Sequence, residues 1–528
     1  MTMIDASSKY QDFISTRNLI RPGHPAVYQL RTKKEEFGSL TRMTVGKKDV
    51  NKINKTILLV GETGTGKSTL INALVNYSMG VKWEDGVWFQ IVEEKEEKRS
   101  QTESQTSDVM MYQIFGFEGK ILPYSLTIID TPGFGDARGI KHDDNVSQKL
   151  SDWFRSEDGV HEVHAVGLVM KGSDNRLSDR LMYVFNSVTS LFGKNMEKNI
   201  VVLITHSNGR KPKNVLEALE AANIKCSRDE KKQPVYYLFN NSQHEDRTEE
   251  EEELLKAQYL ISERGMSQFN LFLEKTGPQK LEESGEVLNN HIRLAACIQN
   301  LQDIIKQTAL KQSEIRQIEE ALKKHEEEMK ENQNYTVEVD EVYKEKEEIG
   351  GGRWLVFYKG AVTCKVCEEN CHFPGCTMAC RPEHCKVMKK GRCTVCTRKC
   401  PASDHVKEKR RYVSKTRKVQ KTMEDMKEKY ERSKTESQSK STLLENLGEE
   451  MKKLTTERSQ LLDEAYQHLV KLEEIALNVN SVSTYVHLDF LIEKMKEEGD
   501  KEKVQKLEKM KSREDEGSRA ALLYKQNQ

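Results

Sequence analysis

Between residues 56 and 274, short apolar runs alternate with stretches of helical periodicity. Five of these runs have the length of buried strands, at residues 57–60, 126–129, 165–170, 200–204 and 235–239. Buried strands that alternate with helices are typical of a parallel sheet covered by helices. The pattern therefore predicts a mostly parallel α/β domain over residues 54–274.

The preceding segment, residues 1–53, is polar and mixed, and we expect an N-terminal extension there. A short alternating piece at residues 26–30 has strand-like character. We assign no chemical role to this segment.

Beyond the α/β domain, apolar positions follow the heptad spacing of coiled-coil helices. One register covers residues 294–329, within a helical segment predicted over 275–334, and polar residues interrupt it. A cleaner register covers residues 444–475, within a helix predicted over 416–480. The register leaves open whether these helices pack on each other, on the α/β domain or on a second chain. The charged, repetitive residues 481–528 predict a helical tail.

Length and charge narrow the class of protein. A chain of 528 residues is too long for one ordinary core, so we expect several structural units. Its 84 Lys and Arg balance 84 Asp and Glu, which argues against a globally basic nucleic-acid-binding protein. The first residues do not resemble a signal peptide, and no apolar run reaches the roughly 18 residues of a membrane span. We therefore expect no transmembrane segment and a cytoplasmic, reducing environment.

The most specific motif is GETGTGKST at residues 61–69, which fits GxxxxGK[ST]. It follows a predicted strand at residues 56–60 and opens a predicted helix at 70–75, as a phosphate-binding loop does. Its glycines let backbone N–H groups face the phosphates, Lys67 reaches the β- and γ-phosphates, and Ser68 ligates Mg²⁺. The predicted contacts in this loop are Gly61, Glu62, Thr63, Gly64, Thr65, Gly66, Lys67, Ser68 and Thr69.

A second motif, DTPG at residues 130–133, ends the second predicted strand. Asp130 is expected to reach the metal through water, and the Gly133 amide to face the γ-phosphate. An acidic residue also ends a strand in ATPases, but DTPG is typical of GTPases, so we favour GTP over ATP. A threonine that closes over Mg²⁺ should lie between the two motifs. Its position favours Thr106, with Thr102 as the alternative.

The element expected to select the base reads THSNG at residues 205–209, where GTPases carry [NT]KxD. The carboxylate that accepts hydrogen bonds from guanine is missing. Asn208 offers a single carbonyl acceptor, and His206 can stack where a lysine stem normally lies. Asn240 and Asn241 follow the last predicted strand and are also placed to contact the base. These residues alone favour phosphate binding more strongly than guanine selectivity.

Nine of the eleven cysteines lie between residues 364 and 400. Without a secretory signal, such crowding favours metal ligands over disulfides, and we predict two or three tetrahedral zinc sites. An iron–sulfur cluster is less favoured, and the spacing does not match a RING domain. Residues 393–405 contain a natural local set of four ligands, but the spacing does not decide which ligands share a metal. The predicted ligands are Cys364, Cys367, Cys371, His372, Cys376, Cys380, Cys385, Cys393, Cys396, Cys400 and His405.

The predicted zinc module spans residues 335–415. Strand-like pieces at 335–339 and 411–413 are expected to pair antiparallel and close the module at its base. Residues 364–411 carry 12 Lys or Arg against 5 Asp or Glu. Zinc-bound thiolates offset most of this excess, so nucleic-acid binding is not expected.

Several motifs together resemble the immune-associated nucleotide-binding family, which is related to septins and to the chloroplast Toc GTPases. They are GETGTGKSTLINAL, DTPGFGD, HAVGLV at 164–169, the histidine of THSNG and FNN at 239–241, and they cover residues 54–274. The resemblance implies a P-loop GTPase that binds GTP and GDP with Mg²⁺, hydrolyses slowly and dimerises through its GTPase face. It implies nucleotide contacts at Lys67, Ser68, Thr106, Asp130, His206, Asn240 and Asn241, with Mg²⁺ held through Ser68, Thr106 and Asp130.

The chain departs from this family in a longer loop at residues 170–176 and in showing no C-terminal membrane anchor. No glutamine is placed to orient water, so we assign no catalytic residue. Arg138 or Arg176 could act as an arginine finger across a dimer. We predict a GTP-controlled assembly switch, forming homodimers or homo-oligomers through the GTPase face and coiled coils, with the zinc module and helices as an interaction platform. The alternative is a scaffold whose nucleotide site is mainly structural, and an ATP-dependent nucleic-acid enzyme is disfavoured.

Overall fold

The computed structural model describes most of the chain. The described residues are 10, 18–37, 40–92, 109–131, 150, 154, 159–174, 178–324, 336–349, 353–354, 357–358, 360–376, 381–422, 441–479, 482–513 and 519.

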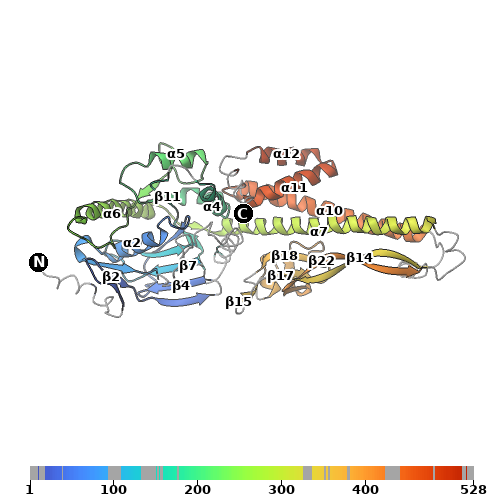
Figure 1. Cartoon of the computed structure of the whole chain (residues 1–528), viewed down its shortest axis with the longest axis horizontal. Helices are drawn as coiled ribbons and strands as arrows, with labels where there is room; N and C mark the ends of the chain where they lie inside the picture. The colour runs from blue at the N-terminus through green and yellow to red at the C-terminus, as the bar shows by residue number, and fades with distance from the viewer. Residues whose placement is uncertain are drawn as a thin grey trace. The chain divides into compact units, whose positions relative to one another are not determined.

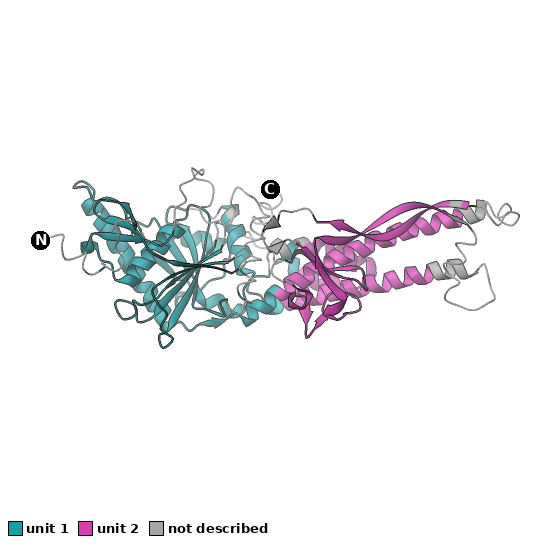
Figure 2. Ribbon diagram, turned by 90° about the horizontal axis from the view of Figure 1, so that it is seen from below, with its two compact units in different colours: residues 1–288, 473–485, 510–528 teal, residues 289–472, 486–509 magenta. Residues whose placement is uncertain are grey.

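The chain folds into two compact units, which Figure 2 shows in different colours. Unit 1 comprises residues 1–288, 473–485 and 510–528, and unit 2 comprises residues 289–472 and 486–509.

Unit 1 is built on an eight-stranded sheet with strand order β12-β11-β10-β5-β8-β7-β4-β3. The pairs β7–β8 and β3–β4 are antiparallel, and all other neighbours are parallel. This confirms the predicted, mostly parallel sheet, and each of the five predicted strands is present. The strands are β3 (Lys33–Phe37), β4 (Leu40–Val45), β5 (Asn54–Val60), β7 (Val109–Ile114), β8 (Ser125–Asp130), β10 (Ala165–Lys171), β11 (Ile200–Thr205) and β12 (Tyr236–Leu238).

Helices cover both faces of this sheet (Figure 1). Helices α2 (Lys67–Met79) and α6 (Glu252–Lys275) share a core with Ile57 and Leu59 of β5. Helices α4 (Asp179–Thr189) and α5 (Lys213–Ala221) share a second core with Leu58 and Val60. Because successive strand residues point to opposite faces and both faces are covered, the central strands are continuously apolar.

The N-terminal segment contributes to this sheet, contrary to the expected separate extension. Strands β4 and β3 precede residue 54 and form one edge, with β4 pairing in parallel with β7. Met43 and Val45 of β4 are buried, while the backbone pairing itself requires no particular side chain. A smaller sheet joins β1 (Leu19–Arg21), β2 (Ala26–Gln29) and β6 (Val87–Gln90), and a two-stranded one joins β9 (Glu162–Val163) and β13 (Gln279–Lys280). Short 3₁₀ turns are η2 (Trp83–Asp85) and η3 (Lys194–Asn199).

A segment from far along the chain completes unit 1. The Leu477 N–H donates to the Phe192 carbonyl oxygen at 2.9 Å, and the Leu477 side chain belongs to the core that contains α4. The Asn478 Nδ2 donates to Asn186 Oδ1 at 2.7 Å. Residues 473–485, expected to divide between a coiled coil and a tail, thus pack on the α/β domain.

Unit 2 contains most of two long helices, α7 (Glu282–Lys324) and α10 (Ser441–Ile475), followed by α11 (Val482–Glu498) and α12 (Lys501–Lys511). The Lys311 Nζ lies 3.0 Å from Glu450 Oε2, and His468 Nδ1 lies 3.0 Å from Asn290 Oδ1. Because residue numbers rise along one helix as they fall along the other, α7 and α10 pack antiparallel. The two helices with heptad spacing therefore pair within the chain.

Strands β14 (Thr336–Glu348) and β22 (Arg410–Thr422) form a long antiparallel ribbon in unit 2. The predicted pairing of these strands is confirmed, but the expected facing pieces are wrong. Residues 337–339 pair with 419–421, whereas 411–413 pair with 345–347, at the opposite end of the ribbon. Both strands are longer than their apolar pieces, because cross-strand ion pairs such as Arg417–Glu341 continue the ribbon between charged residues.

The cysteine-rich module lies between these two strands in sequence. Its sheet has the order β18-β17-β21, and a hairpin joins β19 and β20. Ala296 of α7 belongs to the same buried cluster as the cysteines. The elements are β15 (Arg353–Trp354), β16 (Phe357–Tyr358), β17 (Gly360–Cys364), β18 (Glu369–Cys376), η4 (Pro382–His384), β19 (Met388–Lys389), β20 (Arg392–Cys393), η5 (Ala402–Asp404) and β21 (His405–Glu408). Within the described part of the chain, no helix is both long and apolar enough to cross a membrane.

Candidate functional site

The GETGTGKST loop connects β5 to α2, as the sequence predicts, and α2 begins at Lys67, three residues before the expected start. Gly66 caps the helix with φ 82°, a left-handed conformation that favours glycine. A methyl group on Gly61 would lie 2.4 Å from the Val169 carbonyl oxygen. The loop therefore requires glycine at both positions, for conformation at Gly66 and for close approach at Gly61.

Lys67 lies over this loop and is almost fully buried. Its Nζ donates to the carbonyl oxygens of Gly61 at 2.7 Å and of Glu62 at 3.0 Å. The Thr63 hydroxyl oxygen is buried and has no hydrogen-bond partner among the described residues. The first turn of α2 contains no acidic residue, and its N–H groups have no partners within the helix. A lysine, an orphaned hydroxyl and exposed helix donors together suit a phosphate group.

Asp130 is the last residue of β8 and pairs with Leu59 of β5, beside the start of the loop. It is 1% exposed, and the neighbouring Thr131 Oγ1 donates to the Leu59 carbonyl oxygen at 2.9 Å. The Asp130 carboxylate and the Ser68 hydroxyl are oxygen ligands of the kind that Mg²⁺ prefers. The donor set that the structure describes therefore fits the predicted metal.

Several predicted switch residues lie outside the described residues. They are Thr106 and its alternative Thr102, Gly133, and the two arginines Arg138 and Arg176. Their predicted roles therefore stay predictions.

A pocket of about 160 Å³ runs along the first turns of α2. Asn72 shapes one side of it, because its Oδ1 accepts hydrogen bonds from the backbone N–H groups of Ile91 at 2.9 Å and Val92 at 3.2 Å. The pocket therefore extends the site from the Ser68 side of the helix. Its lining residues are Ser68, Thr69, Asn72, Trp88, Gln90, Val92 and His244.

The THSNG segment follows β11 and touches the phosphate-binding loop. The Thr205 Oγ1 donates to the Thr65 carbonyl oxygen at 2.6 Å. His206 has a positive φ of 50°, and its Nε2 lies 3.6 Å from the position of a Cβ on Gly66. The structure thus brings His206 close to the loop, and its contact with the base stays a prediction. The role of Thr205 as a tether was not predicted, because only the fold places β11 beside the loop.

Asn240 and Asn241 follow β12 and are held by Ser262 of α6. The Asn240 N–H donates to Ser262 Oγ at 2.8 Å, and Ser262 Oγ donates to Asn241 Oδ1 at 2.9 Å. The Asn240 Nδ2 donates to the Ser207 carbonyl oxygen at 2.9 Å, which joins this loop to THSNG. Sequence reasoning missed Ser262, since nothing in its helical context distinguishes it from other polar residues.

Asn208 is exposed, and its Oδ1 accepts from the Arg210 N–H at 3.0 Å. One acceptor position of this carbonyl therefore shapes its own turn. The remaining lone pair is what Asn208 can offer to a base.

His164, the first residue of HAVGLV, has a structural position. Its Nδ1 accepts a hydrogen bond from the Thr56 N–H at 3.2 Å, and its side chain is buried. Burial, helped by the nearby Lys55 charge, lowers the pKa of His164 to about 4. His164 is therefore neutral near pH 7 and joins β5 to the start of β10.

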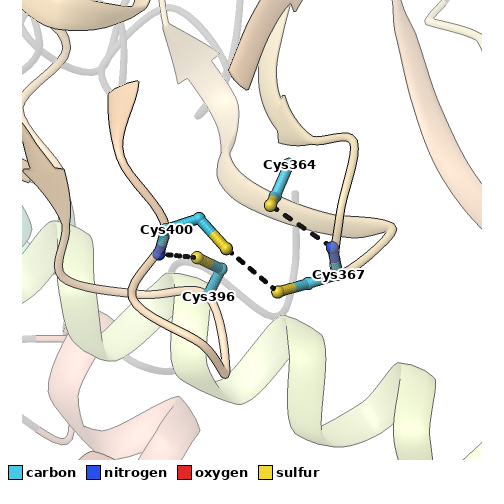
Figure 3. A group of neighbouring side chains, drawn as sticks. All are labelled: Cys364, Cys367, Cys396 and Cys400. Atoms are coloured by element: carbon cyan, nitrogen blue, oxygen red, sulfur yellow. Dashed lines mark hydrogen bonds between the residues drawn. The ribbon is translucent and has the colours of Figure 1, made fainter. Parts of the chain in front are cut away.

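Four cysteines of unit 2 converge at one point (Figure 3). Cys364 ends β17, Cys367 lies in the following turn, and Cys396 and Cys400 lie in the turn after β20, with all four sulfur atoms within 4.8 Å of one another. The Cys367 and Cys400 sulfurs are 3.7 Å apart. A tetrahedral zinc with Zn–S bonds of about 2.3 Å separates its sulfur ligands by about 3.8 Å. The group therefore has the size of a zinc site.

Backbone donors surround these sulfurs. The Cys367 N–H donates to Cys364 Sγ at 3.3 Å, and the Cys400 N–H donates to Cys396 Sγ at 3.2 Å. Hydrogen bonds from Cys371 and Cys393 lower the pKa of the Cys396 thiol, whereas burial raises the pKa of the Cys364 and Cys367 thiols. Cys396 therefore favours thiolate, the form that ligates metals, and a bound cation would favour the thiolates of the other two.

A second group contains Cys371, Cys393, His405 and again Cys396, with ligand atoms within 4.8 Å of one another. The His405 Nδ1 lies 2.9 Å from the Pro401 carbonyl oxygen. Its Nε2 is buried and has no hydrogen-bond partner among the described residues. An imidazole whose Nδ1–H donates to a carbonyl presents Nε2 as a metal ligand.

These groups correct the local set that the spacing suggested. Cys400 joins Cys364 and Cys367 instead of His405, because β17 and β21 pair and bring the two ends of the module together. His372 and Cys385 belong to neither group, although His372 Nδ1 lies 3.3 Å from Cys385 Sγ. Cys376 contributes its backbone to β18, but its side chain and Cys380 lie outside the described residues.

The sequence was compared with known families and proteins. Residues 55–291 match the model of the AIG1 family. GTP-binding protein A of Dictyostelium discoideum is 27% identical over 215 residues, which cover 40% of this chain and 40% of that protein. Septin-5 of Homo sapiens is 30% identical over 149 residues, which cover 26% of this chain and 34% of septin-5. The chain thus spans less than half the length of each of these relatives.

Among solved structures, Toc33 from Arabidopsis thaliana in complex with Mg²⁺ and GMPPNP is similar to the chain at 17% identity. The similarity has a TM-score of 0.28 and covers 43% of this chain and 88% of the Toc33 chain. The predicted resemblance is confirmed by the family match, which begins one residue after the expected domain start and ends beyond its expected end. Residues 55–291 of this chain therefore form an AIG1-family G domain.

Proposed function

We propose that this chain binds GTP and GDP with Mg²⁺, hydrolyses GTP slowly, and uses the bound nucleotide to control its own dimerisation. The observation that carries this proposal is the loop between β5 and α2. It combines a buried Lys67, two positions that require glycine and the N-terminus of a helix. This arrangement binds nucleotide phosphates in P-loop proteins.

In this proposal, Lys67 and the N–H groups at the start of α2 bind the phosphates. Ser68 and Asp130 would hold Mg²⁺, together with Thr106 if that residue closes over the site. The ion would supply positive charge for the phosphate oxygens. His206, Asn240 and Asn241 would contact the guanine base, and Asn208 would offer its second lone pair. Support for guanine comes from the DTPG motif and from the match to the AIG1 family.

We further propose that the cysteine-rich module binds zinc and serves as an interaction platform. The support is chemical. The seven cysteines of the module whose side chains the structure describes are all free thiols. Six of them and His405 form two groups of the size of a tetrahedral metal site. Zinc would fix the module by cross-linking its strands and turns. Thiolate ligands require a reducing environment, so we also propose a cytoplasmic location.

Lys67→Ala tests the nucleotide site. Charge-assisted hydrogen bonds contribute about 1.5–3 kcal/mol each, and Lys67 would contact two phosphates, so GTP affinity should fall by about a hundredfold or more. Binding of a fluorescent GTP analogue to the full chain measures this. Lys231→Ala removes the same charge from an exposed position of the same unit and should leave the affinity unchanged. Undiminished binding by Lys67→Ala would refute the proposal.

Light scattering after size-exclusion chromatography, with GDP and with a non-hydrolysable GTP analogue, tests the switch. The expected result is a dimer whose population depends on the nucleotide. The same oligomer with either nucleotide, and with Lys67→Ala, would instead favour a scaffold with a structural nucleotide site.

A further inference from the structure

Two groups of potential ligands in unit 2 share one residue. We propose that Cys396 bridges two zinc ions, which form a binuclear cluster held by seven protein ligands. This inference deepens the zinc binding proposed above and depends on it. The ligands are Cys364, Cys367 and Cys400 for the first ion, Cys371, Cys393 and His405 for the second, and Cys396 for both.

Among the residues that the structure describes, neither group offers four ligands without Cys396. Each group would otherwise offer three protein ligands, whereas structural zinc is almost always held by four. A water molecule could take the fourth position only in an open site. The surrounding side chains leave little access, because Cys396 and Cys371 are 0% exposed and Cys393 is 2% exposed. The Cys396 sulfur lies within 4.8 Å of the ligand atoms on both sides and fills both positions.

A separate observation supports each metal. For the first, the 3.7 Å between the Cys367 and Cys400 sulfurs is close to the edge of a zinc–thiolate tetrahedron. For the second, the His405 Nδ1 lies 2.9 Å from the Pro401 carbonyl oxygen, which leaves Nε2 as the ligand atom, and the ligand atoms of this group lie within 4.8 Å of one another. Because both ions are supported and both need Cys396, the shared thiolate follows.

Charge also favours the bridge. Two Zn²⁺ ions with six thiolates carry a net charge of about −2, whereas two separate sites of these types would need a seventh thiolate and carry about −3. Burying less uncompensated charge costs less free energy. Lys399, in the same turn, directs its Nζ to the carbonyl oxygens of Thr394 at 3.0 Å and Val395 at 3.3 Å. Its Nζ also pairs with Glu464 Oε2 at 2.7 Å, so Lys399 holds the turn that carries Cys396 but adds little net charge there.

The position of Cys396 explains what the bridge would do for the fold. The first ion would join the end of β17 to the turn after β20, and the second would join β18 and β21 to the same turn. Glu369 already holds this turn, because its Oε2 accepts a hydrogen bond from the Thr397 N–H at 2.9 Å. Loss of either ion should therefore weaken the binding of the other.

Cobalt substitution of the unmodified full chain tests the bridge. Co²⁺ replaces zinc in thiolate sites, and two high-spin Co²⁺ ions that share a sulfur couple antiferromagnetically. The chain, after zinc removal by a chelator, is titrated with Co²⁺ under anaerobic conditions. Thiolate-to-cobalt absorption measures binding, and electron paramagnetic resonance measures the spin. We expect the resonance signal per bound cobalt to fall when the second ion enters the cluster.

Two outcomes separate the bridge from zinc binding in general. A resonance signal that stays proportional to bound cobalt throughout would overturn the bridge and leave the zinc proposal standing. A chain that contains no zinc as isolated and shows no thiolate-to-cobalt absorption would overturn both proposals.

Substitutions provide a second measurement, by native mass spectrometry of the full chain. Cys400→Ser and Cys371→Ser each remove a ligand from one site, and Cys396→Ser removes a ligand from both. We expect Cys396→Ser to lose two zinc ions, or to bind both more weakly than either single-site variant does. Cys226→Ser, a buried thiol of unit 1, is the matched control and should keep all zinc. Loss of a single zinc from Cys396→Ser, with the other bound normally, would contradict the bridge.

Discussion

Ser262→Ala tests whether α6 holds the loop proposed to contact the base. The Ser262 hydroxyl is 2% exposed and accepts a hydrogen bond from the Asn240 N–H at 2.8 Å while donating to Asn241 Oδ1 at 2.9 Å. Alanine removes both bonds without filling the space. The Asn240 N–H then has no acceptor at a site that is largely shielded from water.

The magnitude follows from the cost of an unsatisfied buried donor, which is about 1–3 kcal/mol. If this free energy destabilises the loop conformation that binds the base, GDP affinity should drop by about fivefold to a hundredfold. The hydrogen bonds from Lys67 to the Gly61 and Glu62 carbonyl oxygens do not involve Ser262, so the phosphate-binding loop should keep its conformation. The preference for GDP over ADP should therefore shrink, while ADP affinity should stay nearly constant.

Isothermal titration of the full chain with GDP and ADP, in Mg²⁺ buffer, measures both effects. Ser267→Ala is the control, since Ser267 is an exposed serine on the same helix. Unchanged GDP affinity and an unchanged GDP-to-ADP ratio in Ser262→Ala would refute the proposed role of this loop. Equal weakening of GDP and ADP would show that the damage reaches the phosphate site.

Two further predictions concern the same unit. Gly61→Ala places a Cβ 2.4 Å from the Val169 carbonyl oxygen and should abolish nucleotide binding. In Gly64→Ala the new Cβ meets no atom within 4 Å, so this variant should lose only about 1–2 kcal/mol through the strain of its left-handed backbone. Equal nucleotide affinities of the two variants in a titration would contradict this prediction. Folding lowers the pKa of His164 from 6.5 to about 4. As pH falls, the histidine is therefore protonated in the unfolded chain before it is protonated in the folded one. About 3 kcal/mol of folding stability that is present above pH 6.5 should be lost as pH falls toward 4. His164→Asn keeps an acceptor for the Thr56 N–H and should make the free energy of unfolding less dependent on pH between 6.5 and 4. Amide hydrogen exchange in β5 measures this free energy, and an unchanged pH dependence would contradict the prediction.

Much of the G domain could be predicted from local sequence. Strands buried on both faces are continuous apolar runs, and the phosphate-binding loop has its glycines and lysine at fixed spacing, so both are visible in a window of a few residues. The five predicted strands agree with the structure, and the helix predicted after the loop is α2, which begins three residues earlier than expected, at Lys67. Strands β4 and β3, which end the sheet on one side, were not expected, because strands near an edge need few apolar residues and backbone pairing leaves no mark in the sequence.

Contacts between distant segments were decided by the tertiary structure. Thr205 and Ser262 support the nucleotide site through hydrogen bonds that span 140 and 22 residues, and neither belongs to a motif. The α7–α10 pairing was one of several alternatives, since a heptad pattern shows that a helix has an apolar face without showing what covers it.

The amino-acid sequence by itself determined that this protein has a phosphate-binding loop in an α/β domain and a dense cluster of metal-ligand residues. Which of those ligands lie together was decided only by the fold, which brings the Cys367 sulfur within 3.7 Å of the Cys400 sulfur, thirty-three residues later in the chain. Ligand spacing reports distance along the backbone, whereas a metal ion responds to distance in space. The placement of Cys396 between two ligand groups is for this reason a property of the tertiary structure.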